Sequence, residues 1–233
     1  MRAAIVLFPG LNAETEMIRT VRDVAGIPVY VARHTDVALE PGTTLAVIPG
    51  GFSYGDYLRC GAIAKVAPIV AALRSHADRG GYVLGVCNGF QVLTEAGLLP
   101  GALTRNESLR FVCKDVHVIV EAEGPFTKAA GGRVLRLPVA HGEGRYVADA
   151  ATEAALVQGG RVALRYCDAD GKVTAAANPN GSTSSIAGIY GGPHKNVLGL
   201  MPHPERMSEP LLGGTDGRIL FDSVAGFMRM AAA

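Results

Sequence analysis

The chain has 233 residues, of which 48% are hydrophobic and 18% charged, and its formal net charge at pH 7 is +1. This length suits one large domain better than two small ones, and the apolar fraction supplies ample material for a core. The nearly neutral charge and the lack of a long basic run argue against nucleic acid or an anionic membrane as a partner. No apolar run is long enough to span a bilayer.

The four cysteines, at positions 60, 87, 113 and 167, form no CxxC pair and show no spacing with histidine that is typical of metal sites. The opening residues, MRAAIVLFPG, contain too short an apolar run for a signal peptide and are more typical of a buried strand. We therefore expect reduced thiols, no bound metal and a cytoplasmic location.

Short apolar segments alternate with helical ones through the first half of the chain. Strands are predicted at 3–8, 27–31, 45–48 and 82–86, and helices at 12–25, 63–79 and 88–96. Asn12 is expected to cap the first helix and Gly26 to end it. This alternation is typical of a doubly wound parallel sheet with helices on both faces, in which sites form at the carboxyl ends of strands.

The second half is richer in strands, and some of them are expected to pair antiparallel. They are predicted at 112–120, 134–139, 162–166, 185–190 and 197–201, with a final helix at about 217–230. The sequence therefore predicts an α/β fold whose sheet is mostly parallel, in a single domain spanning residues 1–233.

The strongest local signal is Gly85-Val86-Cys87-Asn88-Gly89, which lies between a predicted strand and a predicted helix. It is the cysteine counterpart of a serine nucleophile elbow, where larger side chains at the two glycines would collide with backbone. A helix N-terminus also stabilises a thiolate, and the backbone N–H of Asn88 would face a developing oxyanion. The alternative is a small buried cysteine in a turn that needs glycine for packing.

A thiol nucleophile needs a base and a group that orients the base. His203 follows an apolar strand, and Glu205 lies two residues further on. His141 and Glu143 have the same arrangement, and the residues alone do not rank the two pairs. The loop 49–56 contains consecutive glycines, so Gly51 or Phe52 is a candidate for a second oxyanion donor, unless this is an ordinary glycine turn.

Taken together, these motifs resemble class I glutamine amidotransferases. The resemblance is closer still to the separate-chain glutaminase subunits of phosphoribosylformylglycinamidine synthases. The segments that carry it span almost the whole chain in order: 49–56, 85–91, 106–108 with Phe111, 141–146, 178–182 and 201–206.

The resemblance implies a flavodoxin-like sheet and a catalytic triad of Cys87, His203 and Glu205, which favours His203 over the other histidine. His141 and its loop then become candidates for the side that faces a partner or hands over ammonia. The residues expected at the substrate are Gly51 and Asn88 for the oxyanion and Phe52, Gln91, Asn106, Ser108 and Phe111 for glutamine.

The resemblance also implies an activity and partners. Glutamine would be hydrolysed to glutamate, and the ammonia would pass to a synthetase chain that converts formylglycinamide ribonucleotide to formylglycinamidine ribonucleotide with ATP. A third small subunit would complete the complex. No cofactor is expected in this chain, and ATP and Mg²⁺ are expected on the synthetase.

Three other functions stay open on the sequence. They are a glutaminase for another synthetase, a cysteine hydrolase or peptidase on a similar sheet, and an inactive scaffold that only binds a partner. The intact Cys87, His203 and Glu205 argue against the scaffold.

Overall fold

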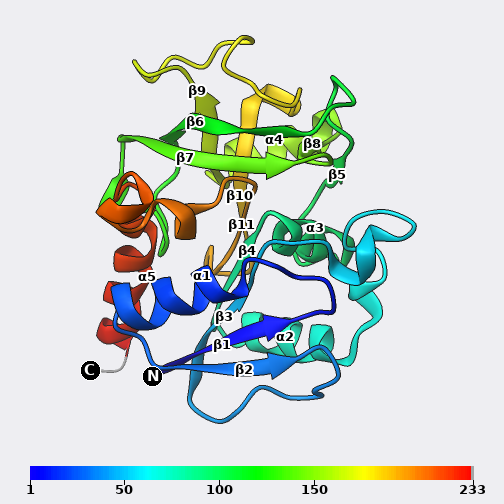
Figure 1. The fold of residues 1–233 in the computed structure, drawn as a ribbon, viewed down its shortest axis with the longest axis vertical. Helices are drawn as coiled ribbons and strands as arrows, with labels where there is room; N and C mark the ends of the chain where they lie inside the picture. Colours follow the sequence, from blue (N-terminus) through cyan, green and yellow to red (C-terminus); the bar gives the residue numbers. More distant parts are fainter. Residues whose placement is uncertain (232–233) are drawn as a thin grey trace.

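The computed structural model describes residues 1–231, and a nine-stranded sheet runs through the whole molecule (Figure 1). Its strands are β1 (Arg2–Leu7), β2 (Val29–Arg33), β3 (Thr43–Ile48), β4 (Tyr82–Val86), β6 (Val112–Val120), β7 (Val134–His141), β9 (Val162–Cys167), β10 (Ile186–Gly191) and β11 (Val197–Leu200). A separate pair consists of β5 (Ala102–Thr104) and β8 (Arg145–Val147).

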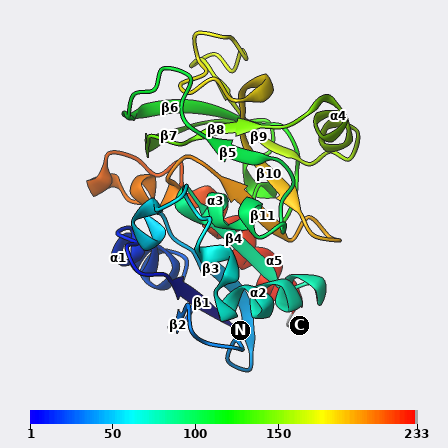
Figure 2. The ribbon, with the colours of Figure 1, turned by 90° about the vertical axis from the view of Figure 1, so that its right-hand side faces the viewer.

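The sheet has a parallel half and an antiparallel half, in the order β2-β1-β3-β4-β11-β10-β9-β6-β7. The pairings from β2 to β11 are parallel, and those from β11 through β10, β9 and β6 to β7 are antiparallel. Figure 2 shows β6, β7 and β9 above the parallel strands. The predicted doubly wound sheet, with antiparallel strands contributed by the second half of the chain, is confirmed.

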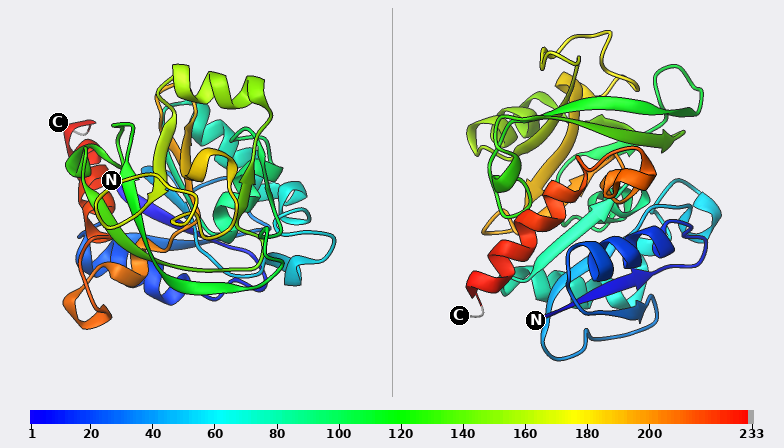
Figure 3. Two further views of the ribbon diagram at one scale, coloured as in Figure 1. Left: turned by 90° about the horizontal axis from the view of Figure 1, so that it is seen from above. Right: turned by 60° about the vertical axis from the view of Figure 1, so that its left-hand side comes forward.

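Helices cover the parallel half from both sides. They are α1 (Glu14–Arg19), α2 (Pro68–Asp78), α3 (Asn88–Glu95) and α5 (Arg218–Ala231). The remaining α-helix, α4 (Ala150–Gln158), lies beside the antiparallel strands (Figures 1 and 2). In the right-hand view of Figure 3, α1 and α5 lie side by side on the near side of the strands. No helix within residues 1–231 has the length and apolar character needed to cross a membrane.

The central strands are apolar throughout because both of their faces are covered. Every residue of β11 is buried, as are the last four residues of β3 and of β4. Phe90 of α3 stacks on Tyr146 of β8 with ring centroids 5.8 Å apart, and both rings are almost fully buried.

Two predicted helices differ from the observed ones. The first begins at Glu14 without a side-chain cap from Asn12, whose backbone N–H instead donates to the Gly50 carbonyl, and it continues as a π-helical turn over Thr20–Val24. The segment 63–79 is broken at Ala67, which is extended because Pro68 disfavours helical geometry at the residue before it. Three observed elements, β5, β8 and α4, were not predicted from the sequence.

The two glycines of the bend after β4 let α3 pack directly on the sheet. A Cβ atom at Gly85 would lie 2.6 Å from the Gly89 carbonyl oxygen, and one at Gly89 would overlap the carbonyl group of Ile48 in β3. The predicted collision with neighbouring backbone is therefore confirmed at both positions.

We expect Gly89→Ala to lower the free energy of unfolding by at least about 1–3 kcal/mol, because the added methyl group meets backbone that has no room to yield. Gly226→Ala is the matched control, since Gly226 lies in α5 with helical φ and open space around its Cα. That change should raise the free energy of unfolding by up to about 1 kcal/mol. Urea unfolding of both variants checks this, and equal effects would contradict the packing argument.

Candidate active site

Cys87 occupies the bend between β4 and α3 with φ 51° and ψ −104°. Positive φ is unfavourable for a residue with a side chain and persists only where the surroundings hold it. Here the Cys87 N–H donates to the Leu200 carbonyl at 2.8 Å, which ties the bend to the end of β11. The side chain is 6% exposed and its sulfur lines a cavity, so the thiol is sheltered but reachable.

His203 reaches the same edge of the sheet from the neighbouring strand. β11 pairs in parallel with β4, Leu200 opposite Val86, so the segments that follow both strands emerge together. A Cβ atom at Gly50 would lie 2.6 Å from Cε1 of His203 and 3.4 Å from Cβ of Cys87, so this glycine borders both side chains. The imidazole and the thiol are therefore neighbours, although 116 positions separate them in the sequence.

Glu205 orients the imidazole. His203 donates from Nδ1 to Oε1 of Glu205 at 2.6 Å, and both side chains are almost completely buried. Nε2 of His203 is also buried and has no hydrogen-bond partner among residues 1–231, which leaves it for the sulfur of Cys87. The three residues thus place a carboxylate, an imidazole and a thiol in series, which is the arrangement that nucleophilic catalysis needs.

The charges around His203 favour its protonated form. Burial alone lowers the pKa of His203, but the carboxylate of Glu205 and a thiolate at Cys87 outweigh that effect and raise the pKa well above its ordinary value. A cationic imidazole next to the sulfur in turn stabilises a thiolate.

His141 lies nearby but has different partners. Its Nδ1 donates to Oδ1 of Asn106 at 3.1 Å, and its Nε2 faces the amide of Asn180 at 3.4 Å. Among residues 1–231 the Glu143 carboxylate makes no hydrogen bond or ion pair with this ring and instead accepts from the N–H of Cys60 at 3.4 Å. Burial, together with the charge of His203, lowers the pKa of His141 to about 4, so this imidazole is neutral at pH 7.

Two backbone N–H groups beside the thiol are unused. Within residues 1–231, the N–H groups of Gly51 and Asn88 donate to no acceptor. The N–H of Phe52 donates to the Gly10 carbonyl at 3.0 Å, so of the two candidates in this loop only Gly51 is available. Gly51 has φ 144°, and a Cβ atom there would lie 2.5 Å from Cα of Leu11, so only glycine fits.

A cavity of about 140 Å³ opens in front of Cys87. Of the residues predicted to hold a substrate, Phe52, Gln91 and Phe111 line it, and Asn106 and Ser108 do not. Asn106 is fully buried and supports the His141 segment, whereas Ser108 is exposed and accepts from the N–H of Arg110.

Three further polar groups line the cavity: Asp56, Cys60 and Glu143. Asp56 and Cys60 were given no role from the sequence, and Glu143 was considered there only as a partner of His141. Burial raises the pKa of Asp56, and the charge of Glu143 raises it further. Hydrogen bonds from Cys60 and Asn88 lower this pKa but do not offset the rise. Burial also raises the pKa of Cys60, as do the two carboxylates, so this thiol stays protonated and is no rival nucleophile. The position of Asp56 at the end of the glycine-rich loop was the sequence signal that could have placed it in the cavity wall. Cys60 lies in no motif that predicts this position.

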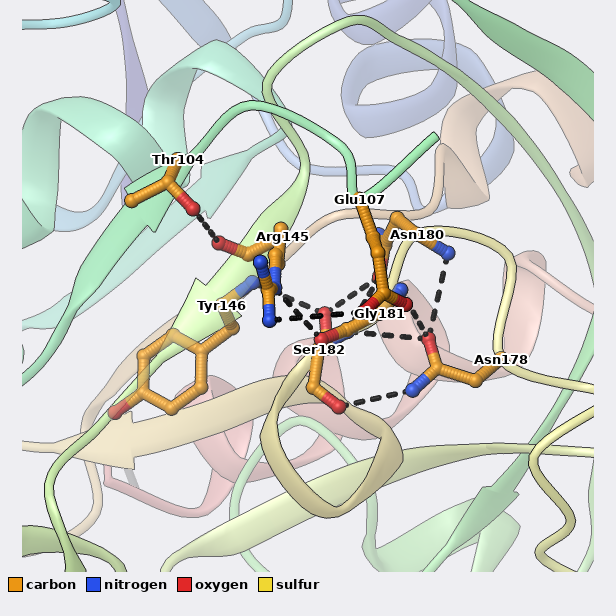
Figure 4. A network of polar contacts seen from close by, with 8 residues as sticks. All are labelled: Thr104, Glu107, Arg145, Tyr146, Asn178, Asn180, Gly181 and Ser182. Carbon is orange, nitrogen blue, oxygen red and sulfur yellow. Dashed lines mark hydrogen bonds and ion pairs between the residues drawn. The ribbon is translucent and has the colours of Figure 1, made fainter. Parts of the chain in front are cut away.

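The loop 178–182 forms a network of hydrogen bonds with the segment around β8 (Figure 4). The Asn178 side chain accepts from the N–H groups of Gly181 and Ser182 at 3.0 and 3.2 Å. Asn180 donates to the Gly144 carbonyl at 2.8 Å, and Ser182 accepts from the N–H of Tyr146 at 3.0 Å. This loop fixes β8 and the segment around His141, and its side chains are engaged within the protein.

Comparison with known proteins gives consistent matches along the chain. The family model of the CobB/CobQ-like glutamine amidotransferase domain matches residues 1–213. A phosphoribosylformylglycinamidine synthase subunit PurQ from Bradyrhizobium diazoefficiens is 53% identical over 234 residues, covering 100% of both chains. The subunit PurQ from Rhodospirillum rubrum is 55% identical over 226 residues, covering 96% of this chain and 98% of its own.

Two solved structures are similar to this one. A chain in the structure of PurLQS from Thermotoga maritima has a TM-score of 0.84 at 40% identity and covers 97% of this chain and 98% of its own. A Thermoplasma acidophilum protein described as belonging to a GMP synthase has a TM-score of 0.59 at 14% identity, covering 100% of this chain and 98% of its own. The second likeness shows the fold alone.

The pKa of His203 should lie above that of an ordinary imidazole, and the pKa of His141 should lie below it. In NMR spectra of the rings we expect His203 to be protonated at pH 7 and to lose its proton only well above that pH, and His141 to be neutral. Glu205→Gln and Cys87→Ser should each lower the pKa of His203, because each removes a negative charge beside the ring. Unchanged titration of His203 in both variants would contradict the proposed contact.

His141 should also make the protein sensitive to mild acid. With a pKa of about 4 when folded and 6.5 as its ordinary value, it contributes full stability above pH 6.5 and loses it as the pH falls toward 4. The loss amounts to roughly 3 kcal/mol, because one pKa unit corresponds to about 1.4 kcal/mol. Urea unfolding between pH 7 and 4 should show a shallower decline in His141→Gln than in the wild type; parallel declines would refute this.

Proposed function

The chain belongs to the CobB/CobQ-like glutamine amidotransferase family, and we propose that Cys87, His203 and Glu205 carry out its glutamine hydrolysis. The protein is the glutaminase subunit of a phosphoribosylformylglycinamidine synthase and supplies ammonia for de novo purine synthesis. Identity above 50% to PurQ subunits over nearly the whole chain supports this assignment. A single glutamine amidotransferase domain over residues 1–233 is part of the proposal.

One observation carries the proposed site: the buried imidazole of His203 lies between the Glu205 carboxylate and the thiol of Cys87. A buried histidine with its Nδ1 committed to a carboxylate and its Nε2 left unpartnered is arranged to move a proton at Nε2. The strained bend that holds Cys87 and the cavity in front of it supply the nucleophile and the space for a small substrate.

The reaction follows from this geometry. The Cys87 thiolate attacks the δ-carbon of glutamine, a C–S bond forms, and the carbonyl oxygen becomes an oxyanion held by the N–H groups of Gly51 and Asn88. The C–N bond then breaks, and the His203 imidazolium gives its proton to the leaving ammonia, which leaves a thioester. His203 next takes a proton from water, and the hydroxide attacks the thioester carbon. The C–S bond breaks, glutamate leaves, and the Cys87 thiolate is regenerated beside the protonated His203.

In this proposal Phe52, Gln91 and Phe111 contact the glutamine, because all three line the cavity. The substrate-binding roles predicted for Asn106 and Ser108 have no support from the cavity. We assign Asn106 to holding His141 instead, through hydrogen bonds to its ring and its carbonyl oxygen.

The ammonia is used by other chains. The protein works with a synthetase subunit, which uses ATP to convert formylglycinamide ribonucleotide to formylglycinamidine ribonucleotide, and with a third small subunit. The likeness to a chain of PurLQS at 40% identity supports these partners. We place the nucleotide and Mg²⁺ on the synthetase. A cytoplasmic location is also proposed, supported by four cysteines that are all free.

Replacing the nucleophile tests the proposal. In the complex with the synthetase, Cys87→Ala should lower glutamine-dependent product formation by at least about 10³-fold, since a missing nucleophile removes the covalent route. Synthesis from added ammonium chloride should persist, because the synthetase is untouched.

Cys113→Ala is the control, since Cys113 is an exposed free cysteine outside the cavity and should leave both activities unchanged. Glutamine hydrolysis at the wild-type rate in Cys87→Ala would refute the proposed chemistry. Turnover of peptides or esters without the synthetase would instead favour the cysteine hydrolase.

A further inference from the structure

The side chain of Asn88 joins the loop after β3 to α3, the helix that Asn88 begins. It is fully buried, and its Oδ1 accepts from the N–H of Ser53 at 3.1 Å. Its Nδ2 donates to Oε1 of Gln91 at 2.9 Å and to Oδ1 of Asp56 at 3.3 Å. Because the Ser53 N–H can only donate, the amide oxygen of Asn88 faces Ser53 and its NH2 group faces Asp56 and Gln91. Both amide hydrogens and the oxygen are thereby in use.

The loop that Asn88 contacts is strained. Tyr54, Asp56 and Leu58 have φ between 54° and 71°, in the left-handed region that residues with side chains disfavour. Such geometry persists only where several contacts over-determine it. The Tyr54 N–H donates to the Pro9 carbonyl at 2.6 Å, and its hydroxyl pairs with His34 at 2.8 Å. Asn88 adds contacts from the nucleophile's own helix.

The chemistry depends on the position of this loop. The two unused N–H groups belong to Gly51, after β3, and to Asn88, after β4. Because these residues are far apart in the sequence, their spacing depends on noncovalent contacts. Ser53 lies two residues beyond Gly51, and the Asn88 side chain starts from the residue that carries the other donor. The hydrogen bond that the Asn88 side chain accepts from Ser53 therefore joins the two segments whose N–H groups must converge on the same oxygen.

We propose that the Asn88 side chain is a positioning residue that sets the spacing of the two oxyanion donors and holds Asp56 and Gln91 in the cavity wall. The inference rests on the proposed function and adds a role for this side chain that is separate from the role of its backbone N–H. It requires an asparagine. Aspartate keeps the acceptor for Ser53 but loses both donors and sets a carboxylate beside Asp56, and alanine loses all three contacts.

Two substitutions distinguish the contact with Ser53 from those with Asp56 and Gln91. Glutamine-dependent kinetics of both variants are measured in the complex with the synthetase. Asn88→Ala should lower kcat for glutamine by roughly 10²–10³-fold, the usual effect of losing one oxyanion donor. Asn88→Asp keeps the bond to Ser53, so its kcat should stay well above that of Asn88→Ala, whereas its KM should rise because Asp56 and Gln91 are displaced. Ammonia-dependent synthesis should be unchanged in both variants.

Asn196 provides a matched control. It is 1% exposed, and its Nδ2 donates to the carbonyls of Ala77 and Gly81 at 2.8 and 2.7 Å. It precedes β11, at the opposite end of the strand from His203. Asn196→Ala and Asn196→Asp should therefore cost stability as a buried asparagine does, and the folded fraction should keep wild-type kcat and KM for glutamine.

The outcomes separate this inference from the function on which it rests. Wild-type kcat in Asn88→Ala, or equal loss of kcat in Asn88→Ala and Asn88→Asp, overturns the positioning role even where Cys87→Ala is inactive. An active Cys87→Ala overturns the proposed function itself. If Asn88→Ala does not fold, Asn88→Asp decides alone: wild-type kcat and KM in that variant overturn the role, and a raised KM with kcat retained supports it.

Discussion

The site depends on the close contact between the start of α3 and the end of β3. Gly89 allows the helix to lie against the Ile48 carbonyl group, where any side chain would overlap backbone. The sharp bend at Cys87, with φ 51°, lies directly before this contact. Cys87, the proposed nucleophile, and the unused N–H of Asn88 therefore both lie next to a packing contact that only glycine allows.

Parallel strands supply the rest of the site. β3, β4 and β11 are neighbours in the sheet, so the loop containing Gly51, the bend at Cys87 and the segment containing His203 emerge at the same edge. Each group comes from a different loop, which is the general arrangement in doubly wound sheets. The antiparallel half contributes the opposite wall, through Ala140 to Glu143 at the end of β7.

The two histidines of the site differ in charge because burial and the charge of His203 lower the pKa of His141, whereas nearby negative charges raise the pKa of His203. Glu205 gives His203 a buried negative charge, which holds a proton on its ring. Asn106 and Asn180 give His141 neutral amides, and these satisfy the ring without stabilising a cation. One imidazole is thus equipped to transfer protons, and the other is a neutral part of the wall.

The sequence by itself determined the elements that local chemistry encodes. The strand Tyr82–Val86 and the bend at Cys87 were predicted because an apolar run, paired glycines and a helix start lie within ten residues. Local chemistry did not rank His203 against His141, or Gly51 against Phe52, and the tertiary structure supplies the physical reason for each choice. These choices depend on which groups the sheet order brings close to the sulfur of Cys87 and on which hydrogen bonds those groups already make. Contacts between distant segments leave no periodic signal in the sequence, so the sequence alone does not reveal them.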